Sequence, residues 1–309
     1  MRLRARWPVF LGPPLAALLV LALRPDVVDR CLGDLRVPTV GDVPAAGWEQ
    51  FATVLTAFGN KPIYMLLALL LALWLRGRRE PDLSRIRWAM ILFFAGESAC
   101  ALSALKLGLC MPLELIHGLG MVAMGALLPW GLLEFLDRRI LNISDPRRAC
   151  VFLRLCNGCW KREERACPLF RLMRLLLPML VVLSFIPLTA PTRPHVVRYV
   201  VWGTPVVDEL FPAIAVAQGL AYPLFAVFFF LWTFVVLRGG PAVIEKAKTP
   251  FFLGVGFFSY ALLRFFLQQS FGDKVFLADV WEELTELSTI IAVGWFLWVF
   301  RQALGLSLR

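Results

Sequence analysis

Four cysteines lie within eighteen residues of a strongly basic segment, with the spacing C-x5-C-x2-C-x7-C-P. Thiolates are soft ligands that select zinc or iron–sulfur clusters. A structural zinc ribbon normally has two C-x2-C pairs, whereas iron–sulfur sites combine such a pair with looser spacings and often a final Cys-Pro. The pattern predicts a four-cysteine centre, with a [4Fe–4S] cluster as the first expectation, structural zinc as the alternative and a metal-free loop left open. Its ligands would be Cys150, Cys156, Cys159 and Cys167.

A second group of reactive residues lies inside apolar sequence. Glu97 and Cys100 belong to one apolar run, and Glu114 and His117 begin the next, three residues apart and hence on one helix face. Ionisable groups within a membrane helix cost about 2.5–3.5 kcal/mol at the centre, so they are candidates for function. Counting from a turn near Leu109 at ~1.5 Å per residue places Cys100 and His117 roughly 12–13 Å deep. We expect these four side chains to form one polar cluster.

Arg264 lies in a later apolar run and needs an acidic partner, for which Glu97 or Glu286 is expected. Snorkelling of Arg264 to the surface is the alternative. The candidate catalytic residues are therefore Glu97, Glu114, His117 and Arg264. A carboxylate di-iron site is excluded because the chain has two histidines and that pattern needs two Glu-x-x-His pairs with two further glutamates. Proton handling at a quinone or ion site, or simple hydrogen bonding at the interface for Glu114 and His117, both fit.

The elements that must position these residues are membrane helices. The 309 residues are 59% hydrophobic, with 25 Phe, 11 Trp and a mean hydropathy of +0.72, which excludes an ordinary soluble domain. A membrane helix needs about 20 apolar residues. The sequence thus predicts an all-α integral membrane protein that forms a single polytopic domain over 1–309. About eight transmembrane helices are expected, near 8–23, 53–75, 88–107, 112–135, 175–191, 210–237, 250–268 and 284–304.

Basic residues predict the orientation. If both termini are cytoplasmic, the inner segments (the termini, 76–87, 136–174 and 238–249) hold 23 of the 32 Lys and Arg residues, with Arg301 at the end of the last run counted in the C-terminal segment. This follows the positive-inside rule and places the Cys-rich loop 136–174, between helices 4 and 5, on the cytoplasmic side. The net charge of +10 is then a topology signal and not a nucleic-acid footprint. The first run could be a signal peptide, but Pro13 and Pro14 interrupt it, so a retained helix is favoured. The segment Val196–Val207 is expected to be amphipathic and to lie at the outer interface.

These features predict a multi-pass protein of a bacterial inner membrane, in contact with membrane lipid and with other subunits of a membrane complex. The first functional expectation is a membrane-embedded subunit of a redox or electron-transfer complex, with the cysteine centre on the cytoplasmic side and a quinone as a candidate partner. The alternative is a proton-coupled transporter with an intramembrane Glu/His/Arg site and a structural zinc loop. An integral enzyme acting on a lipid is a third class, for which no reaction motif stands out. Whether the chain is an enzyme stays undecided.

Overall fold

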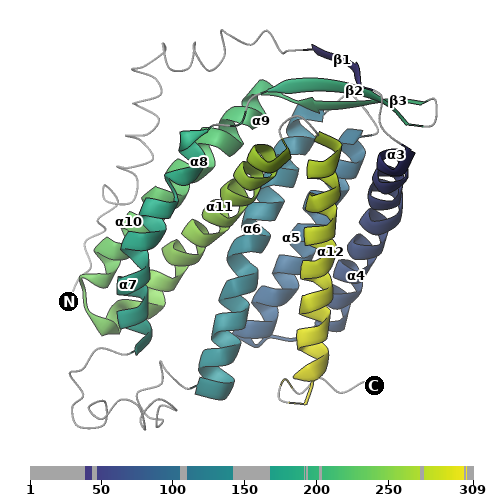
Figure 1. The fold of residues 1–309 in the computed structure, drawn as a ribbon. Coiled ribbons are helices and arrows are strands. Elements are labelled where there is room, and N and C mark those ends of the chain that lie inside the picture. The colour runs from purple at the N-terminus through teal and green to yellow at the C-terminus, as the bar shows by residue number, and fades with distance from the viewer. Residues whose placement is uncertain are drawn as a thin grey trace.

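The computed structural model describes residues 39–43, 47–104, 110–141, 168–190, 192, 194–201, 204–271, 275–302 and 304. The first predicted crossing, 8–23, and the cysteine segment 150–167 lie outside these residues. Within them the chain is a bundle of long helices with a small sheet at one end (Figure 1). We call this end the sheet end and the other the opposite end.

Five helical segments are long and apolar enough to cross a membrane, which confirms a helical protein of the multi-pass membrane type. They are Pro81–Ser103, Met111–Ile140, Phe170–Thr189, Pro212–Leu237 and Ile244–Phe271. Their principal helices are α5 (Pro81–Ala104), α6 (Cys110–Phe135, continued by the π-helical turn Leu136–Leu141), α7 (Pro168–Leu183), α10 (Tyr222–Leu237) and α11 (Ile244–Phe271). The short helices α8 (Ile186–Thr189) and α9 (Pro212–Val216) and the π-helical turn Ala217–Ala221 extend two of these segments.

Two more helical segments coincide with predicted crossings but differ in composition. The first runs from α3 (Gly47–Val54) through a π-helical turn (Leu55–Asn60) into α4 (Lys61–Trp74), an apolar helix of 14 residues. The second is α12 (Val275–Val299), whose 25 residues would suffice in length but include four acidic side chains near its beginning. Two of these acidic side chains, Glu282 and Glu283, form ion pairs with residues of other helices.

Prolines and glycines mark where these helices begin and end. Proline occupies a first-turn position in α4 and α10, where its missing N–H would have had no helical partner. After α4 and after α10, Gly77 and Gly240 adopt positive φ angles of 81° and 84°, the left-handed conformation that ends helices. A short 3-10 turn, Pro241–Val243, then leads into α11. These signals set the two turns at the opposite end of the bundle (Figure 1).

The sheet was missed by the sequence analysis. β2 (His195–Val201) and β3 (Thr204–Leu210) form an antiparallel pair, and β1 (Thr39–Val43) pairs with β2 in parallel. The segment Val196–Val207, predicted to be amphipathic without a defined secondary structure, contributes its described residues to these two strands. Its β-branched residues, mainly valine, favour a strand.

The helices pack into two groups that meet along α6 and α11. One apolar core joins α4, α5, α6 and α12, and the other joins α7, α10 and α11 (Figure 1). Aromatic rings fill the second core, where Trp130 stacks on Phe252 with ring centroids 5.5 Å apart. Residues directed away from both cores include many large apolar side chains, as expected for surfaces that meet lipid.

Glycines let three helices approach until their backbones touch. A Cβ on Gly120 of α6 would lie 2.9 Å from Cα of Gly96 in α5, and one on Gly256 of α11 would lie 2.3 Å from the Val122 carbonyl oxygen of α6. Small residues at such contacts are typical of helix pairs in membranes. Gly96 and Gly120 thus allow the close packing of α5 and α6.

Candidate functional site

The close contact of α5 and α6 fixes the position of the main polar cluster. Gly96 lies against the backbone of His117, with only 3.2 Å between a built Cβ and the His117 carbonyl oxygen. The next residue of α5, Glu97, is thereby held beside the imidazole of His117. The Glu97 side chain is fully buried, and His117 is 6% exposed. Helices α4 and α12 close the other sides, as their shared apolar core requires.

Glu97 is the centre of this cluster. Its Oε2 atom lies 2.7 Å from Nζ of Lys61 and accepts a hydrogen bond of 2.8 Å from the hydroxyl of Tyr64. Its Oε1 atom lies 3.1 Å from Nδ1 of His117, but without the alignment of a hydrogen bond. One carboxylate thus touches an ammonium, a phenol and an imidazole from three directions.

Helix α12 contributes two further carboxylates. Glu283 lies 2.8 Å from Lys61 and 2.5 Å from the hydroxyl oxygen of Tyr64. Glu286, one turn later, is 3% exposed, and its Oε2 atom has no hydrogen-bond partner within the described part of the chain. Carboxylate oxygens of Glu97, Glu283 and Glu286 all lie within 4.8 Å of one another. Two of these three carboxylates, those of Glu97 and Glu283, share the ammonium of Lys61.

The hydroxyl of Tyr64 lies between two acids of this group. A tyrosine has a single hydroxyl hydrogen, so it can donate to one acceptor at a time. Its oxygen nevertheless lies at hydrogen-bond distance from carboxylate oxygens of both Glu97 and Glu283. Both contacts are hydrogen bonds only when one of the two carboxyl groups is protonated and donates to the tyrosine oxygen. The geometry is that of a proton shared between two acids through a phenol.

Cys100 adds a thiol to the same side of the cluster. It lies one turn after Glu97 on α5, and its sulfur is within 4.8 Å of ligand atoms of Glu97 and His117. Cys100 forms no disulfide. From here on, the carboxylate cluster means these seven residues: Lys61, Tyr64, Glu97, Cys100, His117, Glu283 and Glu286.

A chain of polar contacts continues from the cluster toward α11 and the π-helical turn before α10. Arg264 pairs with Glu282 of α12 and donates a 3.1 Å hydrogen bond from Nε to Oε1 of Gln218. The Gln218 amide lies 3.5 Å from the hydroxyl oxygen of Tyr260. The expected partner of Arg264 was Glu97 or Glu286, and that expectation is wrong: Glu282 lies on the helix face that α11 meets, and Lys61 already pairs with Glu97.

The structure brings together three of the four residues predicted to form one cluster. Glu97, Cys100 and His117 meet, whereas Glu114 is partly exposed and is not among the residues whose ligand atoms converge. Sequence reasoning missed Lys61, Tyr64 and Glu283. A usable signal existed, because Lys61 and Tyr64 are three apart on one helix and Glu283 and Glu286 are three apart on another. The four cysteines of the predicted metal centre lie outside the described residues.

A second ionic cluster lies at the opposite end of the bundle. Lys248 is 1% exposed and lies 3.1 Å from Glu134, 3.7 Å from Asp137 and 2.8 Å from Glu245. Arg138 also binds Glu134 at 2.5 Å. Arg139 binds Asp82 at 2.6 Å, and Arg85 lies 3.8 Å from Glu134. We call these eight residues the ionic brace: Asp82, Arg85, Glu134, Asp137, Arg138, Arg139, Glu245 and Lys248.

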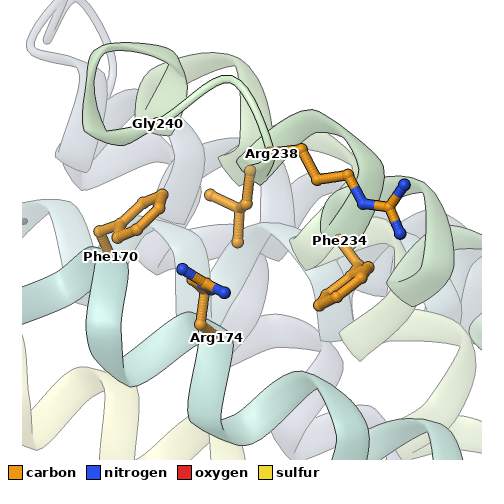
Figure 2. A pocket seen from close by; sticks show the side chains of 6 residues that line it. Phe170, Arg174, Phe234, Arg238 and Gly240 are labelled. Carbon is orange, nitrogen blue, oxygen red and sulfur yellow. The ribbon is translucent and has the colours of Figure 1, made fainter.

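A groove opens near the brace, between α7 and the end of α10. It has a volume of about 400 Å³ and is lined by Phe170, Arg174, Phe234, Leu237, Arg238 and Gly240. Figure 2 shows the guanidinium of Arg174 between Phe170 and Phe234, and that of Arg238 beside Phe234. The arginines lie 5.7 Å and 5.3 Å from the centres of these rings. Arginines stacked on rings at a helix end are typical of residues that reach a headgroup layer, so the groove does not compete with the carboxylate cluster as a reactive site.

No protein-family model, curated protein or solved structure matches this chain. The function is therefore inferred from the carboxylate cluster itself, a buried set of three carboxylates, one ammonium, a phenol, an imidazole and a thiol within a helical membrane bundle.

Proposed function

We propose that this chain is a multi-pass membrane protein that couples protonation of the carboxylate cluster to the movement of a solute across the membrane. The observation that carries the proposal is the contact of the Tyr64 hydroxyl with both Glu97 and Glu283, which is satisfied when a proton resides between the two acids. Buried carboxylates and histidines in membrane helices mark proton relays and ion pathways. Lys61 can pair with either acid, so it holds the cluster together whichever carboxyl carries the proton.

The proposal includes the finer topology. Eight helices cross the membrane, both termini are cytoplasmic, and the sheet end faces outward, because the basic segments 76–87, 136–174 and 238–249 connect helices at the opposite end. The membrane is that of a bacterial cell. The carboxylate cluster would then lie in the outer half of the bilayer, reached from outside through the chain of polar contacts that includes Arg264 and Gln218.

Proton flux into vesicles tests this function. Purified protein is reconstituted into liposomes that contain a pH-sensitive dye, and a potassium diffusion potential drives protons inward. Wild-type vesicles should change internal pH at least about tenfold faster than vesicles with Glu97→Gln, since one relay acid contributes on the order of 10²–10⁴-fold in proton-transfer steps. Tyr64→Phe should also slow the flux, while Tyr222→Phe, at a buried tyrosine of α10, should not. Equal rates for the wild type and Glu97→Gln would contradict the proposal.

The four-cysteine segment supports a second proposal, a membrane-embedded redox subunit. Its spacing, with one C-x2-C pair and a final Cys-Pro, favours a [4Fe–4S] cluster held by Cys150, Cys156, Cys159 and Cys167, with zinc as the alternative. Electrons would pass between this centre and a soluble partner, another subunit or a quinone near the inner face. Anaerobic purification followed by iron and zinc analysis and EPR tests it. About four iron ions per chain and a reducible signal abolished by Cys156→Ser would support it, and one zinc without a signal would favour a structural loop.

A further inference from the structure

We propose that Glu97, Cys100 and His117 form a binding site for a divalent transition-metal ion of the zinc class. Carboxylate oxygen, thiolate sulfur and imidazole nitrogen are the three ligand types that bind zinc in proteins. One atom of each lies within 4.8 Å of the other two, and Glu97 and His117 are almost completely buried. The site uses residues of the carboxylate cluster, but it does not depend on the proton-coupled function.

Two buried ligand atoms face each other at this position, and they form an ion pair only when the imidazole is protonated. Nδ1 of His117 and Oε1 of Glu97 are both buried, and neither has a hydrogen-bond partner within the described residues. They lie 3.1 Å apart without the alignment of a hydrogen bond. Two ligand atoms bound tetrahedrally to zinc at ~2.0–2.2 Å are themselves roughly 3.3–3.5 Å apart, so the pair needs little movement to share one ion.

The two oxygens of Glu97 have separate roles in this arrangement. Oε2 is taken by Lys61 and Tyr64, at 2.7 Å and 2.8 Å, and these contacts orient the carboxylate. Oε1 is left on the side of His117. Outer contacts that hold a ligating carboxylate in place are a regular feature of metal sites.

The charge of the surroundings favours a divalent cation. Glu97, Glu283 and Glu286 carry three formal negative charges when ionised, and Lys61 supplies one positive charge. With one of these acids protonated, as the Tyr64 contacts require, a neutral imidazole and Cys100 as the thiolate that binds the metal, two negative charges remain, and a divalent ion neutralises them. Three protein ligands also leave a fourth position open for water or a small ligand, as in zinc sites that are not purely structural.

Cobalt(II) is the probe for this site, because a cobalt–thiolate bond gives a charge-transfer band and four-coordinate cobalt gives intense visible bands. The full-length chain carries serine at Cys150, Cys156, Cys159 and Cys167, so that the predicted loop centre cannot contribute. We expect about one cobalt ion per chain, displaced by an equal amount of zinc. Cys100→Ser should abolish the charge-transfer band, and His117→Gln should lower the affinity about 10- to 100-fold or more.

Two variants serve as matched controls. Cys110→Ser removes the other cysteine of the same helix pair, and Glu114→Gln removes the carboxylate three residues before His117. Both should leave the cobalt spectrum unchanged. Absence of bound cobalt, or a spectrum that Cys100→Ser does not alter, would overturn the proposal.

If the four-serine chain does not elute as a single species, the same variants are compared in the wild-type background. There, Cys100→Ser should bind one metal ion fewer per chain than Cys110→Ser, and equal stoichiometries would overturn the proposal. Neither readout involves proton flux. A failure of the metal site is therefore distinguishable from a failure of the proton-coupled function.

Discussion

The carboxylate cluster and the ionic brace are two ion networks with buried members in one helical bundle, yet their charges are balanced differently. The brace joins four basic to four acidic residues, and each of its carboxylates has a cation nearby. The carboxylate cluster sets three acids against one ammonium and leaves Glu286 Oε2 without a hydrogen-bond partner in the described chain. A balanced network stabilises a fold, whereas an unbalanced one has room for a proton or a cation. Burial alone does not separate the two roles.

The largest effect is expected from breaking the brace at its buried cation. Lys248→Met leaves the carboxylates of Glu134 and Asp137 buried without their ammonium, and loss of one partner from a buried pair costs about 3–5 kcal/mol. Unfolding in mixed micelles of increasing SDS content measures the loss. Lys246→Met, at an exposed lysine of the same helix, is the control and should change stability by less than ~0.5 kcal/mol. Equal stability of both variants would show that the brace is not structural.

In the carboxylate cluster, by contrast, removal of a charge is not expected to lower the free energy of unfolding. Glu286→Gln removes a buried acid whose Oε2 atom has no hydrogen-bond partner among the described residues, and it relieves repulsion from Glu97 and Glu283. The free energy of unfolding should stay unchanged or rise by about 1–3 kcal/mol, the cost of an unsatisfied buried group. Glu134→Gln, the matching change in the brace, should lower it. If both variants lose similar stability in the same SDS titration, the contrast between the two regions fails.

A third prediction concerns the close contact of α5 and α6 beside the carboxylate cluster. Gly120→Ala places a methyl group 2.9 Å from Cα of Gly96, so α5 and α6 must separate, at a cost of about 1–3 kcal/mol. Gly294→Ala is the control, because its methyl would lie 3.7 Å from the nearest side-chain atom of Leu71 and would favour the helix. Thermal unfolding followed by size-exclusion chromatography should show a loss for the first variant only. A loss in both would mean that close packing is not specific to this contact.

The smallest effect on stability is expected for an exposed cation of the same brace. Arg138 binds the same carboxylate as Lys248, but its side chain is 52% exposed. Arg138→Met should therefore cost only about 0.3–0.5 kcal/mol, the usual value for an exposed pair four residues apart on a helix. The SDS titration used for Lys248→Met resolves the two variants. If Arg138→Met lowered the free energy of unfolding as much as Lys248→Met, the contribution of each cation would depend on its charge and not on its burial.

The sequence was sufficient for the membrane class and for part of the site. Long apolar runs predict helices because the hydrocarbon leaves the backbone few alternatives, and the Glu97–His117 pairing followed from a short turn between antiparallel neighbours. The partner of Arg264 could not be predicted, because the rotation of α11 about its axis depends on contacts such as that of Gly256 with α6. Lys61 falls within the predicted run 53–75 without a partner that the sequence could name, and only the packing of α4 against α12 shows that it lies between two acids. The β-hairpin was missed because its valines are equally common in membrane segments.

Infrared difference spectroscopy tests the central claim most directly. Protein in lipid is taken from mildly acidic to mildly basic pH, in buffer with chelator, and the carboxylic-acid C=O band is followed with its shift in D2O. We predict a band that disappears as the pH rises, that is lost in Glu97→Gln or altered in Tyr64→Phe, and that persists in Arg138→Met. A wild-type spectrum without such a band, or a band that Glu97→Gln and Tyr64→Phe leave unchanged, would contradict the assignment of proton exchange to the carboxylate cluster.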